Sequence, residues 1–117
     1  MKNLYKYSCN IYPQYLWVAI GKEGISDFEE DIEEMETDTC GETIVVDNGS
    51  ESGVLIRFEN VEYMTEMNIT HESVHAAIYI FDYINADVDV EHQEPFAYLA
   101  GWVAQCCRDA KNKKLKE

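Results

Sequence analysis

The N-terminal third of the chain changes from a strand-like to a helix-like pattern of hydrophobic positions. Residues 4–11 alternate aromatic and polar side chains, and residues 15–20 form a continuous apolar run. This pattern predicts two strands, and the second is expected to lie inside the sheet. From residue 25 the apolar spacing becomes three and four, and Ser26 with Glu29 has the form of a capping box. We therefore expect a helix over residues 27–36.

The middle of the chain predicts a hairpin followed by a long helix. Residues 43–46 and 54–58 are apolar runs, separated by a segment rich in Gly, Asn and Ser that is typical of an antiparallel turn. Thr65 is a candidate cap for a helix that extends to about Ile84. The hydrophobic stripe expected to face the core consists of Val74, Ala77 or Ile78, Phe81 and Ile84.

A last helix begins between Glu91 and Glu94, because Pro95 is tolerated in the first helical turn. The elements together predict one small α+β domain over residues 1–117, with a strand-rich half over 1–62 and a helical half over 63–111. We expect about four strands in a mostly antiparallel sheet, an acidic supporting helix, the long helix and the C-terminal helix.

Composition and charge restrict the possible partners. The chain has 46% hydrophobic residues, which is enough for one core, and a formal net charge of -14. Such a charge repels nucleic acids and anionic membranes, and it favours a cation or a basic partner. Without an apolar signal region or a membrane span, the chain is expected to be soluble and cytoplasmic. Nine acids between Glu23 and Asp38 indicate a solvated helix face or, alternatively, a docking surface for a basic partner.

The cysteines do not predict a metal site or a disulfide framework. Two of them are adjacent, and no pair has the CxxC spacing of a zinc ribbon. We expect Cys9, Cys40, Cys106 and Cys107 to act as small hydrophobic residues.

The long predicted helix contains an HExxH motif, formed by His71, Glu72 and His75. Two histidines four residues apart project from one helix face, which is half of a zinc site. Glu72 lies on the flank of that face, where it can act as a base without binding the metal. The alternative is that all three are polar residues of a solvated helix face. The expected core stripe lies on the other side of the helix, so the histidines are not part of it.

A strip of small residues on the last helix gives a second piece of evidence. Glu94, Ala97, Gly101 and Ala104 share one face, and glycine inside a helix costs about 1 kcal/mol relative to alanine. Close packing against the motif helix would explain the glycine, and it would deliver Glu94 towards the histidines. The alternative is that Glu94 only places a favourable negative charge at the start of the helix.

The HExxH motif, followed 19 residues later by Glu94, resembles the gluzincin arrangement of zincin metallopeptidases. The resemblance implies a zincin-like fold in which His71, His75 and Glu94 bind Zn2+ and Glu72 is the general base. It further implies that a peptide or protein substrate pairs with the last strand before the motif helix, residues 54–58. The sequence around the motif and around Glu94 is also similar to small metallopeptidase-like proteins carried by bacterial phages and prophages.

The chain departs from larger gluzincins near the third ligand. Tyr98 stands where an aspartate would orient a ligand histidine, so this support is weaker or comes from elsewhere, with Asp82 as a candidate. His92 is an alternative third ligand, and His92, Tyr98 and Tyr83 are candidates to stabilise an oxyanion. The expected function is zinc-dependent hydrolysis of a peptide bond. The alternative is a non-catalytic binding or regulatory module in which the metal is structural and fastens the two helices.

Overall fold

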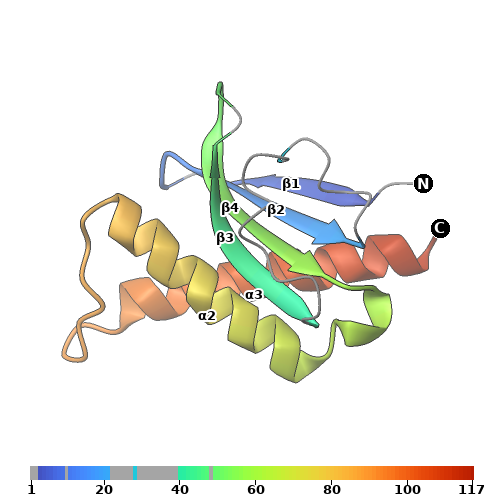
Figure 1. Cartoon of the computed structure of the whole chain (residues 1–117). Helices are drawn as coiled ribbons and strands as arrows, with labels where there is room; N and C mark the ends of the chain where they lie inside the picture. Colours follow the sequence, from blue (N-terminus) through green and yellow to red (C-terminus); the bar gives the residue numbers. More distant parts are fainter. Residues whose placement is uncertain (1–2, 10, 22–27, 29–39, 48) are drawn as a thin grey trace.

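The sheet has four strands and mixed pairing. The computed structural model describes residues 3–9, 11–21, 28, 40–47 and 49–117. In these residues the strand order is β1-β2-β4-β3, with strands β1 (Leu4–Ser8), β2 (Tyr15–Ile20), β3 (Gly41–Asp47) and β4 (Ser52–Phe58) (Figure 1). β1 with β2 and β3 with β4 are antiparallel, whereas β2 with β4 is parallel. The α+β class and the hairpin are thus confirmed, and the helix expected over residues 27–36 lies outside the described residues apart from Phe28.

Two helices cover one face of the sheet (Figure 1). A short 3-10 turn, η2 (Val61–Tyr63), leads into α2 (Glu66–Tyr83), and α3 (Glu94–Leu115) follows. The Thr65 hydroxyl accepts a hydrogen bond from the backbone N–H of Asn68 at 3.2 Å, which confirms Thr65 as the cap. α3 begins at Glu94 with Pro95 in its first turn, as expected. Neither α2 nor α3 is long and apolar enough to cross a membrane.

Both faces of the central strands are buried. Helix-facing side chains of β2 and β4, including Leu16, Val18 and Ile56, form the main core with α2 and α3. Trp17 and Leu55 point to the opposite face and pack in a second cluster. This two-sided burial explains why residues 15–20 are apolar without interruption, and it confirms that the second strand is an interior one.

The buried face of α2 differs from the expected stripe. Val74 and Ile78 are 38% and 43% exposed, so placing them in the core was wrong. Two expected members fit better, because Ala77 and Phe81 are buried. The remaining contact face is formed by Ile69, Glu72, Ser73, Ala76 and Ile80. The small alanine side chains let the helix lie close to the sheet, and the helix is therefore turned so that even Glu72 is covered.

The edge of the sheet next to α2 is β3. β4 pairs with β2 on one side and with β3 on the other, so the expectation that residues 54–58 form an edge for a peptide is wrong. The reason is the parallel crossover: the chain returns beside β2 only with β4, and the hairpin partner β3 is left on the outside (Figure 1).

The two helices form an antiparallel pair. The rings of Phe81 and Phe96 lie 5.4 Å apart near the connection, and Lys111 Nζ donates to the Met64 carbonyl at 2.8 Å near the other end. Asn85, with a φ of 58°, follows the end of α2 and turns the chain back. These contacts fix which turns of the two helices face one another.

The strip of small residues on α3 does not make the expected close contact. Ala97 and Gly101 are exposed, and a Cβ added to Gly101 would meet no neighbouring atom within 4 Å. The strip borders a shallow hollow beside Ile69 and Thr70, while α3 uses its other side, with Leu99 and Val103, for the core. The packing explanation for Gly101 is therefore wrong.

Gly101→Ala is accordingly expected to stabilise the protein by about 0.5–1 kcal/mol, because alanine is the better helix former and its methyl group has open space. Urea unfolding followed by circular dichroism measures the change in the free energy of unfolding. A loss of stability would mean that the helices approach more closely at this position than the structure indicates.

Candidate metal site

His71 and His75 lie one turn apart on the exposed side of α2. Their Nε2 atoms are 3.3 Å apart, and their ring planes are inclined by 74°. Both side chains are exposed, as expected from their position opposite the core. The two nitrogens therefore converge on one point at the protein surface.

The separation of the imidazole nitrogens fits a shared zinc ion. Two nitrogens that each bind tetrahedral zinc at about 2.0–2.1 Å lie about 3.3–3.4 Å from one another. The separation of 3.3 Å between His71 Nε2 and His75 Nε2 needs no rearrangement to reach that value. The same distance also suits a hydrogen bond between two neutral rings, whose shared proton a metal ion would replace.

Glu72 is held beside the histidine pair but faces inward. The residue is 7% exposed, and its Oε1 accepts a hydrogen bond of 2.7 Å from the hydroxyl of Thr43 on β3. Its second oxygen, Oε2, lies 3.9 Å from His71 Nε2. A carboxylate so placed can exchange a proton with a neighbouring group through one water molecule. Thr43 was missed in the sequence analysis, because it lies 29 residues before Glu72 and no local pattern connects them.

Glu94 is not brought to the histidines. The ring contact between Phe81 and Phe96 places the start of α3 beside the end of α2. His75 lies six residues before Phe81, which corresponds to about 9 Å along the helix axis. Within the described part of the chain, no three His, Cys, Asp or Glu side chains form a group that could hold a metal ion. The structure thus assembles the two histidines and the base, and it leaves the third ligand as a prediction.

Glu94→Gln tests that third ligand. Because Glu94 lies at the far end of the helical pair, the substitution is expected to change zinc affinity by less than about twofold. If Glu94 were a ligand, affinity would fall by more than the roughly 10- to 100-fold that is lost with a residue that only hydrogen-bonds to a ligand. Competition with a chromogenic chelator measures the affinity. A large loss would show that α3 moves to complete the site.

The other candidates for the site lie apart from it. His92 is exposed, and its Nδ1 is 2.8 Å from Asp89 Oδ2. This hydrogen bond, together with one from the Glu91 backbone N–H, lowers the pKa of Asp89. Asp82 lies seven residues beyond His75, or about 10 Å along the axis, so it is not in contact with the histidine nitrogens. Tyr83 and Tyr98 are 53% and 76% exposed, and Tyr83 lies eight residues beyond His75, or about 12 Å along the helix axis.

The cysteines do not add ligands. All four are free, and Cys9, Cys106 and Cys107 are buried, as expected of small hydrophobic residues, whereas Cys40 is exposed. Burial raises the pKa of the Cys106 and Cys107 thiols to about 12, so both remain protonated and are poor nucleophiles.

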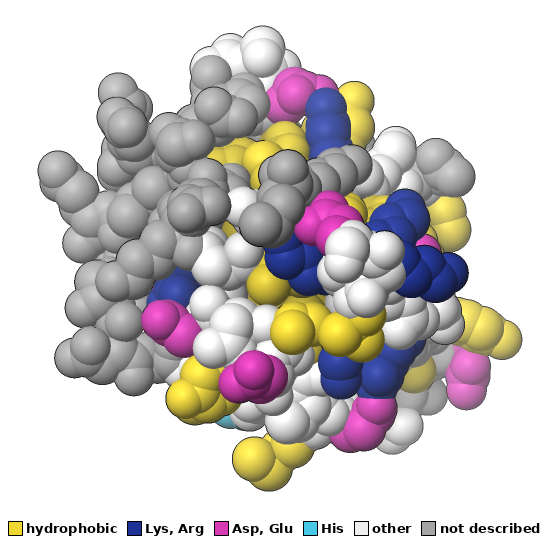
Figure 2. All heavy atoms as spheres, turned by 90° about the vertical axis from the view of Figure 1, so that its right-hand side faces the viewer, with side chains coloured by type: hydrophobic (Ala, Val, Ile, Leu, Met, Phe, Trp, Pro, Cys, Tyr) yellow, Lys and Arg dark blue, Asp and Glu magenta, His cyan; other side chains and the backbone are white. Residues whose placement is uncertain are grey.

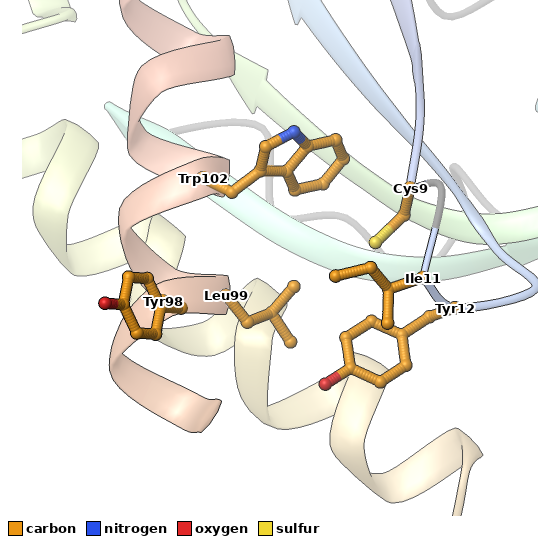
Figure 3. Close-up of a pocket in the computed structure, with 6 residues that line it drawn as sticks. All are labelled: Cys9, Ile11, Tyr12, Tyr98, Leu99 and Trp102. Atoms are coloured by element: carbon orange, nitrogen blue, oxygen red, sulfur yellow. The ribbon is translucent and has the colours of Figure 1, made fainter. Parts of the chain in front are cut away.

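An apolar hollow lies elsewhere on the molecule. It has a volume of about 240 Å³ and lies between the turn after β1 and the first half of α3 (Figure 3). Its lining consists of Cys9, Ile11, Tyr12, Tyr98, Leu99 and Trp102. None of these belongs to α2, so the hollow is separate from the histidine pair. It carries no carboxylate or imidazole that would act as an acid or a base.

The basic side chains are interleaved with acids. On the face shown in Figure 2, Lys and Arg side chains lie beside Asp and Glu side chains. Lys113 lies 3.0 Å from Asp109, and Arg108 is paired with Glu66. Neighbouring acids offset the positive charge that a phosphate backbone would need. The absence of nucleic acid among the partners stays a prediction.

Comparison with known proteins gives no relative for this chain. No family model matches the sequence, and no curated protein or solved structure matches it. The motif and the geometry around it are therefore the basis for assigning a function.

Proposed function

We propose that the protein is a zinc-dependent, metallopeptidase-like hydrolase, with His71 and His75 as metal ligands and Glu72 as the base. The observation that carries the proposal is the 3.3 Å separation of the two Nε2 atoms, together with the Glu72 carboxylate oxygen that lies 3.9 Å from His71 Nε2. Two surface histidines without a common function would not be expected to show both this separation and an adjacent buried carboxylate. The resemblance of the motif to gluzincins supports the same assignment.

The residues have separate tasks in this reaction. Zinc held by the two histidines would polarise a peptide carbonyl and lower the pKa of bound water. Glu72 would accept a proton from the attacking water at Oε2 and then donate it to the nitrogen of the leaving amine. Thr43, through its bond to Oε1, keeps the carboxylate beside the histidines.

The edge strand β3 is the proposed site of the peptide. β3 lies next to α2, and its Thr43 is bonded to the base. An extended peptide that pairs with this edge would pass close to the histidines. This assignment replaces the expected pairing with residues 54–58, because β4 is inside the sheet.

A non-catalytic module with a structural metal is the second candidate. It is supported by the position of Glu94. Since Glu94 does not lie beside the histidines, the described residues provide only two ligands, and such a site resembles an incomplete catalytic centre. However, a metal held by α2 alone does not fasten α2 to α3, so the structural role would need a further ligand from outside α2. The two candidates share the histidine pair and differ in whether Glu72 takes part in chemistry.

Zinc content tests both candidates together. Protein purified without chelator is expected to contain about one zinc per chain, to hydrolyse fluorescein-labelled casein, and to lose that activity in EDTA. Elemental analysis gives the metal content, and fluorescence gives the rate. Absence of zinc, with a melting temperature that EDTA leaves unchanged, would remove both proposals. Zinc without hydrolysis would favour the structural role.

A further inference from the structure

Glu72 occupies an unusual position for a carboxylate. It is 7% exposed and lies on the sheet-facing side of α2, among residues such as Ala76 and Ile80 that pack in the main core. A buried carboxylate is unfavourable unless hydrogen bonds compensate for the lost water. An apolar residue would serve packing better, so the carboxylate needs a reason other than stability.

Two residues of β3 accommodate the Glu72 side chain, Thr43 by a hydrogen bond and Gly41 by leaving space. The Thr43 hydroxyl lies 2.7 Å from Glu72 Oε1 and 3.3 Å from the Glu72 carbonyl oxygen. A hydroxyl has one proton, and the shorter distance assigns it to the carboxylate. Two residues earlier, on the same face of the strand, Gly41 leaves room for the side chain: a Cβ there would lie 3.4 Å from Glu72 Cγ and 3.3 Å from the Phe58 ring.

The contact fixes the orientation of the carboxylate. Because Oε1 is bound by Thr43, the other oxygen is the one that lies towards His71 Nε2, at 3.9 Å. Without the hydroxyl, the carboxylate can rotate, and neither oxygen is held at the site. A base is effective only when it is held in hydrogen-bonding geometry with the group that it deprotonates.

We propose that Thr43 is a positioning residue that orients Glu72 towards the His71–His75 pair and links the base to the edge strand. The inference rests on the proposed metal site and adds to it a residue outside the HExxH motif. An extended peptide that pairs with β3 would bind to the strand that also holds the base. Substrate position and base orientation are then set by one structural element.

The test uses Co2+, whose visible absorption reports on its surroundings, in the full-length protein. Thr43→Val removes the hydroxyl at nearly constant volume, and Thr43→Ser retains it. Thr70→Val makes the same chemical change at an exposed position of α2. Thr43→Ala provides a second variant without the hydroxyl, in case valine is not tolerated next to Gly41. Circular dichroism confirms that each variant is folded.

Thr43→Val and Thr43→Ala are expected to bind Co2+ within about twofold of the wild type, because Thr43 is not a ligand. The visible absorption bands of the bound Co2+ are expected to change in both variants relative to the wild type, because the Glu72 carboxylate is no longer held beside the histidine pair. Thr43→Ser and Thr70→Val should retain the wild-type spectrum.

Unchanged Co2+ spectra in both hydroxyl-free variants would overturn the inference while leaving the metal site in place. An equal spectral change in Thr43→Ser would also overturn it, because the effect would then come from packing. If the wild-type protein does not bind Co2+, the proposed function and this inference fail together.

Discussion

Zinc affinity is expected to fall by more than about 100-fold when either His71 or His75 is replaced by alanine. Loss of a residue that only hydrogen-bonds to a ligand costs 10- to 100-fold, and loss of the ligand itself should exceed this. The effect should be large because the two nitrogens, 3.3 Å apart, are the proposed ligands, and no described group of three or more His, Cys, Asp or Glu side chains offers another metal site. Isothermal titration with Zn2+ measures the loss. Both side chains are exposed, so the fold should be retained.

The matched control is His92→Ala. This histidine is exposed like the other two, but its Nδ1 is 2.8 Å from Asp89 in the connection between α2 and α3. Zinc affinity should therefore change by less than about twofold. A large loss in His92→Ala would identify His92 as the third ligand, the alternative that the sequence left open. Equal affinity of all three variants and the wild type would contradict a site at the motif.

The parts of the site that lie close together in the sequence were predictable. His71 and His75 are separated by one helical turn, so the 3.6-residue period alone places both on one face. Their exposure was expected because neither belongs to the expected core stripe, of which Ala77 and Phe81 are buried. The cap at Thr65 and the start of α3 at Glu94 also followed from local rules, because side-chain hydrogen bonds and the proline ring act within one turn.

The parts that depend on contacts between distant segments were not predictable in the same way. A strip of small residues on α3 is compatible with close packing, but only the register of the helical pair shows that Gly101 lies at an open hollow. The position of Glu94 follows from the same register. The identity of the edge strand depends on the parallel pairing of β2 with β4, which no local pattern in residues 54–58 specifies.

The contact between Thr43 and Glu72 shows how the sheet contributes to the site. The helix supplies the histidines and the carboxylate, but their relative orientation depends on β3, which the hairpin holds outside β4. The sequence places the motif glutamate only on the flank of the histidine face. The structure adds that it is buried and bonded through one oxygen. A buried carboxylate that is hydrogen-bonded through one oxygen is oriented to act as a base, whereas a glutamate on a solvated helix face is not.

Glu72→Gln is expected to leave zinc binding intact and to lower the rate of hydrolysis by about 10²- to 10⁴-fold, the usual contribution of a general base. The amide has the shape of the carboxylate, and its oxygen can still accept the hydrogen bond from Thr43, so the fold and the histidine pair should not change. The amide nitrogen cannot take up a proton as a carboxylate does. Casein hydrolysis at equal zinc content measures the effect.

Glu91→Gln is the control, because it makes the same change at an exposed position in the connection before α3. Its rate and its zinc content should both match the wild type. If Glu72→Gln retains full activity, the base is another group and the buried carboxylate has only a packing role. If the variant loses zinc, the carboxylate contributes to metal binding. Loss of turnover with retained metal supports the assignment of proton transfer to Glu72 and excludes Glu72 as a metal ligand.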